Sequence, residues 1–259
     1  MPIDEIVKRA GGPRPPADLI RYIAGIDDYD EIVRSGAEVF TMFDLATQRL
    51  AGKPIRDFHR ILDFGCGIGR VLQFFPDGPE LFGCDVNKPV TEFAKHAFPR
   101  AEIRRNNLMP PMEYAERTFD LIYSYSVFSH LSLTVENSWL EELRRIGAKG
   151  CFYLVTVHGD WMIEATLGGE QTKAEQEGFY YKTGNHRPGT DLDFPEYYES
   201  SYHTSQYILT HWSKRFDVLA IIKGEDPCRY LWGDVRFEPI GNIPLFRPMG
   251  QDLVVMRKP

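Results

Sequence analysis

Short apolar runs alternate with helix-like segments from residue 60 onward. Four apolar runs and one more polar segment predict strands, at residues 61–64, 81–85, 119–124, 151–157 and 101–106. Helical segments are expected at 69–75, 89–98 and 135–146, with Gly150 marking the end of the last helix. Strands this hydrophobic are covered on both faces, and their alternation with helices predicts a parallel sheet in an α/β domain.

The two ends of the chain and one internal stretch depart from this pattern. After a break rich in Gly and Pro at 11–16, apolar residues recur at helical spacing, so residues 1–58 are expected to form a helical N-terminal extension. Residues 159–203 show no clear period, which indicates an inserted lid. A helix at 205–216 and strands at 217–223 and 251–257 complete a domain over 59–259, interrupted by an irregular insertion at about 225–249.

Charge and composition narrow the class of protein. The chain has 259 residues, 43% of them hydrophobic, and a formal net charge of -7. An acidic surface repels a phosphate backbone, so nucleic acid is not an expected partner. The basic pairs at 104–105 and 144–145 are isolated, and the second pair belongs, with Glu141 and Glu142, to the helix face that we expect to be exposed.

Cysteine usage and the N-terminus bear on localisation. Cys66, Cys84, Cys151 and Cys228 show no Cys-x-x-Cys spacing and lie in or beside apolar stretches, which favours reduced, buried thiols. The first residues lack the pattern of a signal peptide, and no apolar run approaches the ~20 residues that span a bilayer. We therefore expect a cytoplasmic protein without a membrane partner.

A glycine-rich turn follows the first predicted strand. Gly65, Gly67 and Gly69 stand at alternate positions between that strand and a predicted helix, where glycines allow a sharp turn and close contact between the backbone and a ligand. Asp85 ends the next strand, 20 residues after Gly65. At that distance an acidic residue reaches the ribose hydroxyls of a nucleoside bound across two adjacent strand ends.

Two classes of ligand fit such a turn. Dinucleotide binders use Gly-x-Gly-x-x-Gly, whose last position is small, but Arg70 occupies that position here. Asp63 also places a carboxylate beside the turn, which would repel a pyrophosphate and suit the ammonium group of a methionine moiety. The spacing therefore favours S-adenosyl-L-methionine over NAD. In a plainer interpretation, the glycines are only turn residues and Asp85 caps the next helix.

The order of motifs resembles that of class I S-adenosylmethionine-dependent methyltransferases. Segment 63–70 (DFGCGIGR) is similar to their motif I, and segment 83–87 (GCDVN) to their second-strand motif. The similarity continues through 119–124 and 127–131, then through 139–150, and extends more loosely to 251–255. The resemblance implies a Rossmann-like, doubly wound sheet of seven strands, mostly parallel with the last strand antiparallel.

The resemblance also assigns cofactor-binding roles. At the methionine end, Asp63 would hold the amino group through water, and Ser124 would offer its carbonyl to the same group. Gly65, Cys66 and Gly67 would supply backbone contacts.

At the nucleoside end, the resemblance implies that Asp85 binds both ribose hydroxyls and that Val86 lies against the adenine ring. Asn106 or Asn107 would meet the adenine amine, where the family usually has Asp.

Methyl transfer from a sulfonium is an in-line displacement, so catalysis consists of alignment and, for a hydroxyl acceptor, removal of a proton. Histidine is the natural base near neutral pH. His130 follows the fourth strand, His158 ends the fifth, and His203 lies where the lid returns to the core, while His186 lies within the lid. Each could instead be a capping or solvent-facing residue.

The lid is rich in aromatic residues, which would build either an acceptor pocket or a small core of its own. These are Trp161, Phe179, Tyr180, Tyr181, Phe194, Tyr197, Tyr198 and Tyr202. No metal site is expected, because Asp160 is the one carboxylate placed for it.

The sequence thus predicts a methyltransferase that acts on a small-molecule acceptor, with oxygen favoured over nitrogen or carbon. The alternatives are a non-catalytic protein that binds S-adenosylmethionine or another nucleoside, and an NAD-dependent oxidoreductase, which Arg70 disfavours. Homodimer formation is left open.

Overall fold

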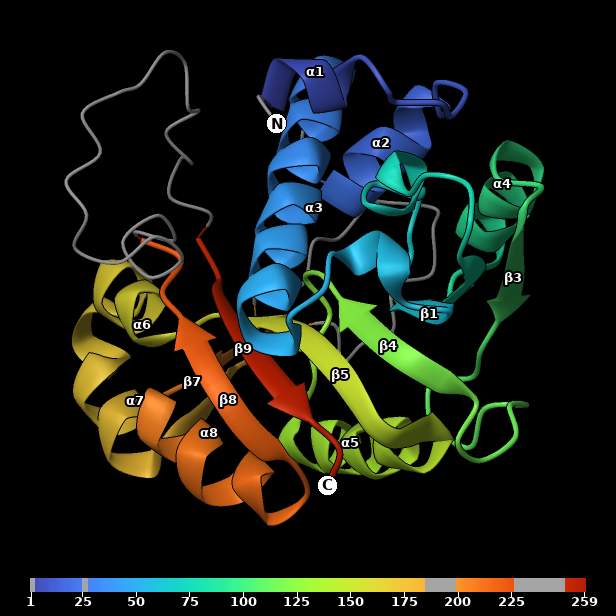
Figure 1. Cartoon of the computed structure of the whole chain (residues 1–259). Helices are drawn as coiled ribbons and strands as arrows, with labels where there is room; N and C mark the ends of the chain where they lie inside the picture. Colours follow the sequence, from blue (N-terminus) through green and yellow to red (C-terminus); the bar gives the residue numbers. More distant parts are fainter. Residues whose placement is uncertain (1–2, 25–27, 185–198, 226–249) are drawn as a thin grey trace, which may run out of the picture.

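A seven-stranded sheet forms the centre of the computed structural model, which describes residues 3–24, 28–184, 199–225 and 250–259 (Figure 1). The strands are β1 Arg60–Phe64, β2 Glu80–Asp85, β3 Ala101–Arg105, β4 Phe119–Ser124, β5 Gly147–Val157, β8 Asp217–Ile222 and β9 Asp252–Arg257. Their order is β3-β2-β1-β4-β5-β9-β8. The pairs among β1 to β5 are parallel, and β9, the last strand, is antiparallel to both neighbours. The predicted Rossmann-like sheet is confirmed.

Alternating residues of the strands build two cores, one on each face of the sheet. Leu121 and Tyr123 of β4 contribute to one core, and Ile122 between them contributes to the other. Helices α1 Ile3–Val7, α3 Tyr29–Ala51 and α4 Lys88–Ala97 pack on the first face, and α5 Leu133–Ile146 and α8 Ser205–His211 on the second. Helix α2 Ala17–Ala24 packs through Leu19 and Ile20 on a smaller cluster with Ile32 and Val90.

Two predicted helix boundaries are wrong. Residues 69–75 form turns and a short 3₁₀ helix, η2 Leu72–Phe74, because the left-handed backbone of Gly69 (φ 78°) and Pro76 leave too few residues for an α-helix. Gly150 does not end helix α5, which stops at Ile146; Gly147 takes an extended conformation (φ -71°, ψ 139°) and begins β5 directly. Two further 3₁₀ helices extend helical segments, η1 Ile55–Asp57 after α3 and η4 Trp212–Lys214 after α8.

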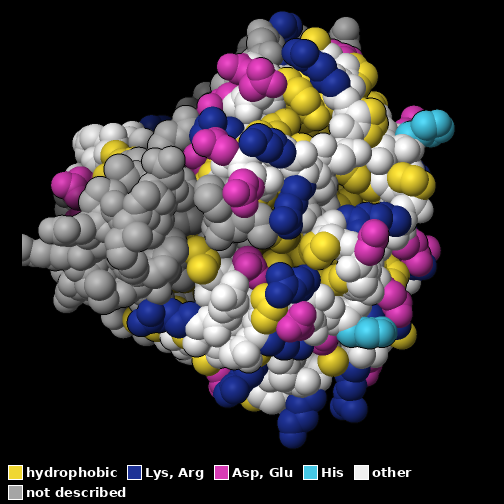
Figure 2. All heavy atoms as spheres, turned by 45° about the horizontal axis from the view of Figure 1, so that its top comes forward, with side chains coloured by type: hydrophobic (Ala, Val, Ile, Leu, Met, Phe, Trp, Pro, Cys, Tyr) yellow, Lys and Arg dark blue, Asp and Glu magenta, His cyan; other side chains and the backbone are white. Residues whose placement is uncertain are grey.

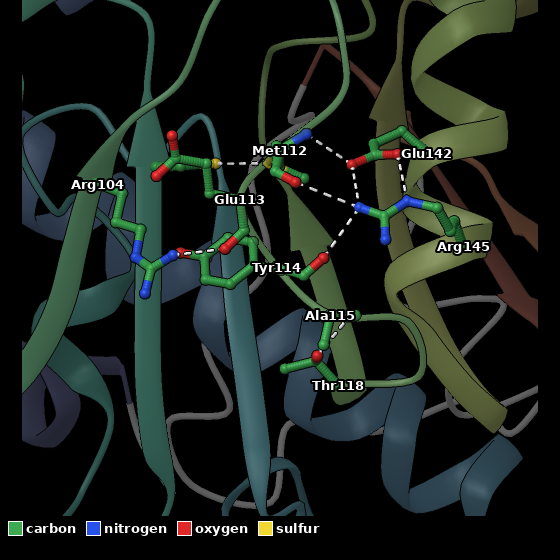
Figure 3. Close-up of polar contacts among 9 residues, drawn as sticks. Arg104, Met112, Glu113, Tyr114, Ala115, Thr118, Glu142 and Arg145 are labelled. Atoms are coloured by element: carbon green, nitrogen blue, oxygen red, sulfur yellow. Dashed lines mark hydrogen bonds and ion pairs between the residues drawn. The ribbon is translucent and has the colours of Figure 1, made fainter.

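The face of α5 that carries Glu142 is buried, contrary to expectation. The Glu142 side chain is 5% exposed, and its carboxylate accepts hydrogen bonds from the Met112 N–H (2.6 Å) and from Arg145 (2.7 and 2.8 Å). Arg145 also donates to the carbonyls of Met112 and Tyr114 (Figure 3). Burial alone would raise the pKa of Glu142, but these hydrogen bonds outweigh it and lower the pKa. The pair therefore fixes the loop between β3 and β4.

The insertion after β5 is folded where the structure describes it. It contains α6 Asp160–Thr166, η3 Gly168–Glu170, α7 Gln171–Glu177 and the antiparallel hairpin β6 Phe179–Lys182 with β7 Ser200–His203. Its own small core is built from Ile163, Leu167, Ala174 and Tyr202. Three of the predicted lid aromatics, Phe194, Tyr197 and Tyr198, lie outside the described residues, as do His186, Cys228 and nearly all of the insertion at 225–249.

Strand β7 is hydrogen-bonded to the carboxyl edge of the main sheet. The Ser201 N–H donates to the Ser129 carbonyl (2.8 Å), and the His203 N–H donates to the His158 carbonyl (2.9 Å). The Ser201 hydroxyl donates to the carbonyl of Phe128 (2.7 Å). The described part of the insertion is therefore fixed over the ends of β4 and β5.

Three of the four cysteines, Cys66, Cys84 and Cys151, are free and buried, as predicted. Within the described ranges, no helix combines the length and the apolar character that crossing a membrane requires.

The N-terminal helices share a core with the sheet. Phe43 of α3 packs against Tyr123 of β4, with ring centroids 5.6 Å apart. Gly36 of α3 lies so close to the glycine-rich turn that a Cβ there would be 2.2 Å from the Arg70 carbonyl oxygen. Helix α3 therefore packs directly against the end of the turn that follows β1.

Substitution of Gly36 by Ala tests this close approach. Alanine favours a helix interior by about 1 kcal/mol over glycine, but the added methyl group must displace the Arg70 carbonyl. We expect Gly36→Ala to lower the free energy of unfolding by about 1–3 kcal/mol, the usual cost of overpacking, as measured by urea denaturation. Gln48→Ala, on the exposed side of the same helix, is the control and should change stability little. A Gly36→Ala protein more stable than the wild type would contradict the packing of α3 on the turn.

Candidate active site

The glycine-rich turn folds back over the end of β2. Gly65, Gly67 and Gly69 all have left-handed backbones, with φ of 79°, 51° and 78°. The N–H groups of Gly65 and Cys66 both donate to the Cys84 carbonyl (2.9 Å each). A Cβ on Gly65 would lie 2.2 Å from Cγ2 of Val127, in the segment after β4. The turn thus lies against the exits of both β2 and β4, at the switch point of the strand order, where α/β sheets bind ligands.

Asp85 connects three segments at this edge. Its Oδ2 accepts from the Gly67 N–H (3.1 Å), its Oδ1 from the Asn87 N–H (2.9 Å), and its carbonyl from the Asn106 N–H (3.1 Å). Burial raises the pKa of the Asp85 carboxyl, and the backbone N–H groups oppose that shift. The cap of α4 is Asn87, whose Oδ1 accepts from the Val90 N–H (3.1 Å), so Asp85 is not the helix cap.

Asn106 and Asn107 differ in surroundings. Oδ1 of Asn106 is buried and has no hydrogen-bond partner in the described part of the chain, while its Nδ2 donates to the Asn107 carbonyl (2.9 Å). The Asn107 side chain is exposed. A buried, unpaired carbonyl oxygen is costly, so Asn106 fits an amine donor such as that of adenine. Val86 is partly exposed beside it, and its carbonyl accepts from Nε of Arg105 (2.9 Å).

The Asp63 side chain is buried rather than exposed to solvent. It is 3% exposed, and its Oδ2 accepts from the Tyr123 hydroxyl (2.8 Å). Burial raises the pKa of Asp63 to about 8, although the Tyr123 hydrogen bond lowers it and the nearby charge of Asp85 adds to the rise. Ser124, next to Tyr123, is fully buried, and its hydroxyl has no partner among the described residues. The eight positions 63, 65–67, 85–86, 106 and 124 therefore gather along the ends of β1 to β4.

The histidines at positions 130 and 158 face one another. Their ring centroids are 6.0 Å apart, and both side chains are partly exposed. Nδ1 of His130 is 2.8 Å from the Glu199 carbonyl oxygen. Burial, with the proximity of His130 and His203, lowers the pKa of His158 to about 3, so this ring is neutral at physiological pH.

His203 has a different environment. Its side chain is fully buried, and Nε2 lies 2.5 Å from Oε2 of Glu136, which is also fully buried. Glu136 accepts further hydrogen bonds from the Tyr207 hydroxyl (3.0 Å) and from Nε1 of Trp212 (2.9 Å). Through these side chains, α5 is connected to β7 and to the α8 segment, which comprises α8 and η4. The His203 N–H donates to the His158 carbonyl. The structure therefore brings all three predicted histidines together, with His203 on the inner side.

Glu136 was not among the predicted site residues, although its position in the sequence indicates that it is buried. Glu136 precedes Trp139 by three residues and Leu140 by four, so it lies on the apolar face of α5. An acid on such a face has to find buried donors.

The segment after β4 also holds features that no motif indicated. Ser126 has a positive φ of 60°, which is uncommon outside glycine. Its N–H donates to Oγ1 of Thr156 (2.8 Å), and its hydroxyl accepts from Nε2 of Gln251 (2.9 Å). Backbone conformations of this kind cluster at functional sites.

Asp160, the carboxylate considered for a metal, is held by a lysine. Nζ of Lys223 donates to Oδ2 of Asp160 (2.7 Å), to Oδ2 of Asp252 (2.9 Å) and to the Ser205 hydroxyl (2.7 Å). This ion cluster joins the ends of β5 and β8 to the start of β9.

Comparison with known proteins agrees with this geometry. Residues 61–150 match the family described as a methyltransferase domain. Three similar solved structures come from Pyrococcus horikoshii OT3, from Methanosarcina mazei (a SAM-dependent methyltransferase) and from Haloferax volcanii (a methyltransferase in complex with a methyltransferase activator). A search of curated proteins finds no significant match.

The similarity to these three structures is one of fold. The TM-scores are 0.54, 0.53 and 0.54, and the sequence identities are 15%, 15% and 14%. The matches cover 82%, 78% and 95% of this chain and 88%, 93% and 100% of the others. With the sheet order and the glycine-rich turn, the match over residues 61–150 agrees with the fold of the class I methyltransferases that the sequence resembles, and with S-adenosyl-L-methionine as the cofactor expected from that resemblance.

The raised pKa of Asp63 predicts proton release on cofactor binding. Below about pH 8 the buried carboxyl is protonated in the free protein. A nearby ammonium group favours the ionised form and lowers that pKa. Binding of S-adenosylhomocysteine at pH 7 should therefore release a fraction of a proton approaching one, measured by titration calorimetry in buffers of different ionisation enthalpy.

Asp63→Asn is the control for this experiment, because the amide does not titrate and should remove the release. Equal heats in all buffers for the wild type would show that the amino group is held elsewhere.

Proposed function

We propose that the protein transfers the methyl group of S-adenosylmethionine to an oxygen atom of a small molecule, with His130 as the base. The observation that carries this proposal is the pair His130 and His158, partly exposed at the ends of β4 and β5 beside the turn that follows β1. A hydroxyl acceptor has to lose a proton during transfer, and a positioned imidazole serves that need near neutral pH.

The tautomer of His130 suits this role. A carbonyl oxygen only accepts hydrogen bonds, so the contact with the Glu199 carbonyl places the proton of the neutral ring on Nδ1. Nε2 then carries the lone pair that receives a proton. His158, kept neutral by burial, adds no positive charge beside it. His203 acts in this proposal through its neighbours, since its ring is fully buried against Glu136.

The cofactor supplies an electrophilic methyl group on its sulfonium. Asp63 and the Ser124 carbonyl would hold the amino group of its methionine part, and the backbone of residues 65–67 would lie along it. Asp85 would receive the ribose hydroxyls, exchanging its present bonds to N–H groups for bonds to the ligand. Oδ1 of Asn106, which has no partner among the residues that the structure describes, favours this residue over Asn107 as the partner of the adenine amine.

A small acceptor agrees with the surface of the molecule. On the face shown in Figure 2, Lys and Arg side chains are interspersed with Asp, Glu and hydrophobic ones, without an extended basic patch. The net charge of -7 disfavours a polyanionic substrate. The docked hairpin β6–β7 narrows access to the ends of β4 and β5. Residence in the cytoplasm and a role in small-molecule metabolism remain predictions.

Replacement of Asp85 tests the nucleoside end of the site. Asp85→Ala should weaken binding of S-adenosylhomocysteine by tenfold or more, because charge-assisted hydrogen bonds to the ribose are lost. Calorimetry gives the affinity, and Asp77→Asn is the control. Asp77 is exposed and precedes β2, so it lies at the opposite edge of the sheet. Unchanged affinity in the Asp85 variant would mean that another residue holds the ribose.

Replacement of His130 tests the base. In a screen of phenols, hydroxy acids and amines, the acceptor that yields most S-adenosylhomocysteine serves as substrate. His130→Ala should lower kcat by at least a hundredfold, the usual contribution of a general base, and leave cofactor affinity unchanged. An amine as the best substrate, or full activity of the variant, would contradict the proposal. Cofactor binding without turnover on any acceptor would instead favour a non-catalytic binding protein.

A further inference from the structure

Arg70 directly follows the glycine-rich turn, and its guanidinium lies between two other elements. Nε and Nη2 donate to the hydroxyl of Ser35 on α3 (3.1 and 2.5 Å), and Cζ lies 4.8 Å from the centre of the Tyr125 ring. The approach of α3 at Gly36 restricts the backbone of Arg70, and the contacts with Ser35 and Tyr125 hold its side chain. Contacts with the protein therefore fix the position of the guanidinium.

The charge of Arg70 is not balanced where the structure describes the chain. Among those residues, no Asp or Glu lies within ion-pair distance of its guanidinium; a neutral hydroxyl and an aromatic ring are its neighbours. Two other partly buried cations differ, since Arg145 is paired with Glu142 and Lys223 with Asp160 and Asp252. A partly buried, fixed cation without a carboxylate is a preorganised site for an anion.

The position of Arg70 indicates which ligands could bring an anionic group to its guanidinium. Tyr125 follows Ser124 at the exit of β4, the edge where the proposed function places the methionine part of the cofactor and the acceptor. Ser35 accepts from Nε and Nη2, which leaves the N–H groups of Nη1 and the second N–H of Nη2 for the two oxygens of a carboxylate.

We propose that Arg70 binds the carboxylate of a ligand at this edge, a proposal that rests on the proposed function. Two molecules could bring that group: the cofactor, through its methionine carboxylate, or the acceptor, through a carboxyl group of its own. In both cases Ser35 and Tyr125 act as positioning residues that hold the guanidinium in place.

The two sources are separated with two nucleosides, one of which lacks the amino-acid part that carries the carboxylate. S-adenosylhomocysteine carries the amino-acid part, and 5′-methylthioadenosine lacks it. Arg70→Met keeps the length and apolar packing of the side chain and removes the charge. If the cofactor is the source, this variant binds S-adenosylhomocysteine at least tenfold more weakly than the wild type and binds 5′-methylthioadenosine equally well.

If the acceptor is the source, both nucleosides bind the variant normally. Benzoate, and not benzamide, then raises the melting temperature of the wild type saturated with S-adenosylhomocysteine, and Arg70→Met abolishes that rise. Arg56→Met, an exposed arginine beside Asp57, is the matched control and should behave as the wild type.

Two results would overturn the proposal. One is wild-type behaviour of Arg70→Met toward all four probes, and the other is equal weakening of both nucleosides, which would indicate a distorted turn. Either result leaves the proposed function standing as long as Asp85→Ala weakens nucleoside binding and His130→Ala blocks turnover.

Discussion

Asp85 is the residue on which the arrangement of the carboxyl edge of β1 to β3 depends. Its carboxylate accepts hydrogen bonds from the Gly67 N–H in the turn after β1 and from the Asn87 N–H at the start of α4. Its backbone carbonyl accepts one from the Asn106 N–H after β3. A single residue thus sets the spacing of three chain segments. Because its partners are N–H groups, the carboxylate is preorganised for hydrogen-bond donors, and in the proposed function cofactor binding would exchange these partners for ribose hydroxyls without rearranging the fold.

A second carboxylate, that of the fully buried Glu136, orders the region of the three histidines in the same manner. Three donors from the hairpin and from the α8 segment converge on it, and each would be left unsatisfied without it. The hairpin strand β7 is thereby tied to α5 and, through its backbone, to the segments that carry His130 and His158. The glycine-rich turn and the region of the histidines are therefore built in the same way, by an acid that accepts hydrogen bonds from segments distant in sequence.

Much of this was predictable where short-range rules apply. The strands of the main sheet were placed to within a few residues at their ends, since buried strands are short apolar runs, whereas the hairpin strands β6 and β7 were not predicted. The turn with Asp85 was found because its spacing reflects a fixed β–turn–α geometry. The predictions were wrong where contacts with neighbouring residues decide the local structure. Residues 69–75 matched a helical pattern yet are limited by Gly69 and Pro76, and Glu142 appeared to be a surface residue until the loop between β3 and β4 covered it.

The sequence alone determined the class of fold and the order of the motifs, and it predicted the cofactor, since each rests on local spacing along the chain. Only the tertiary structure decided which side chains share an environment. It paired Asp63 with Tyr123, buried His203 against Glu136 while leaving His130 and His158 partly exposed, and set Arg70 between Ser35 and Tyr125 without a counter-charge among the described residues. The physical reason is that burial and charge pairing depend on contacts between residues far apart in the chain, which periodicity does not encode.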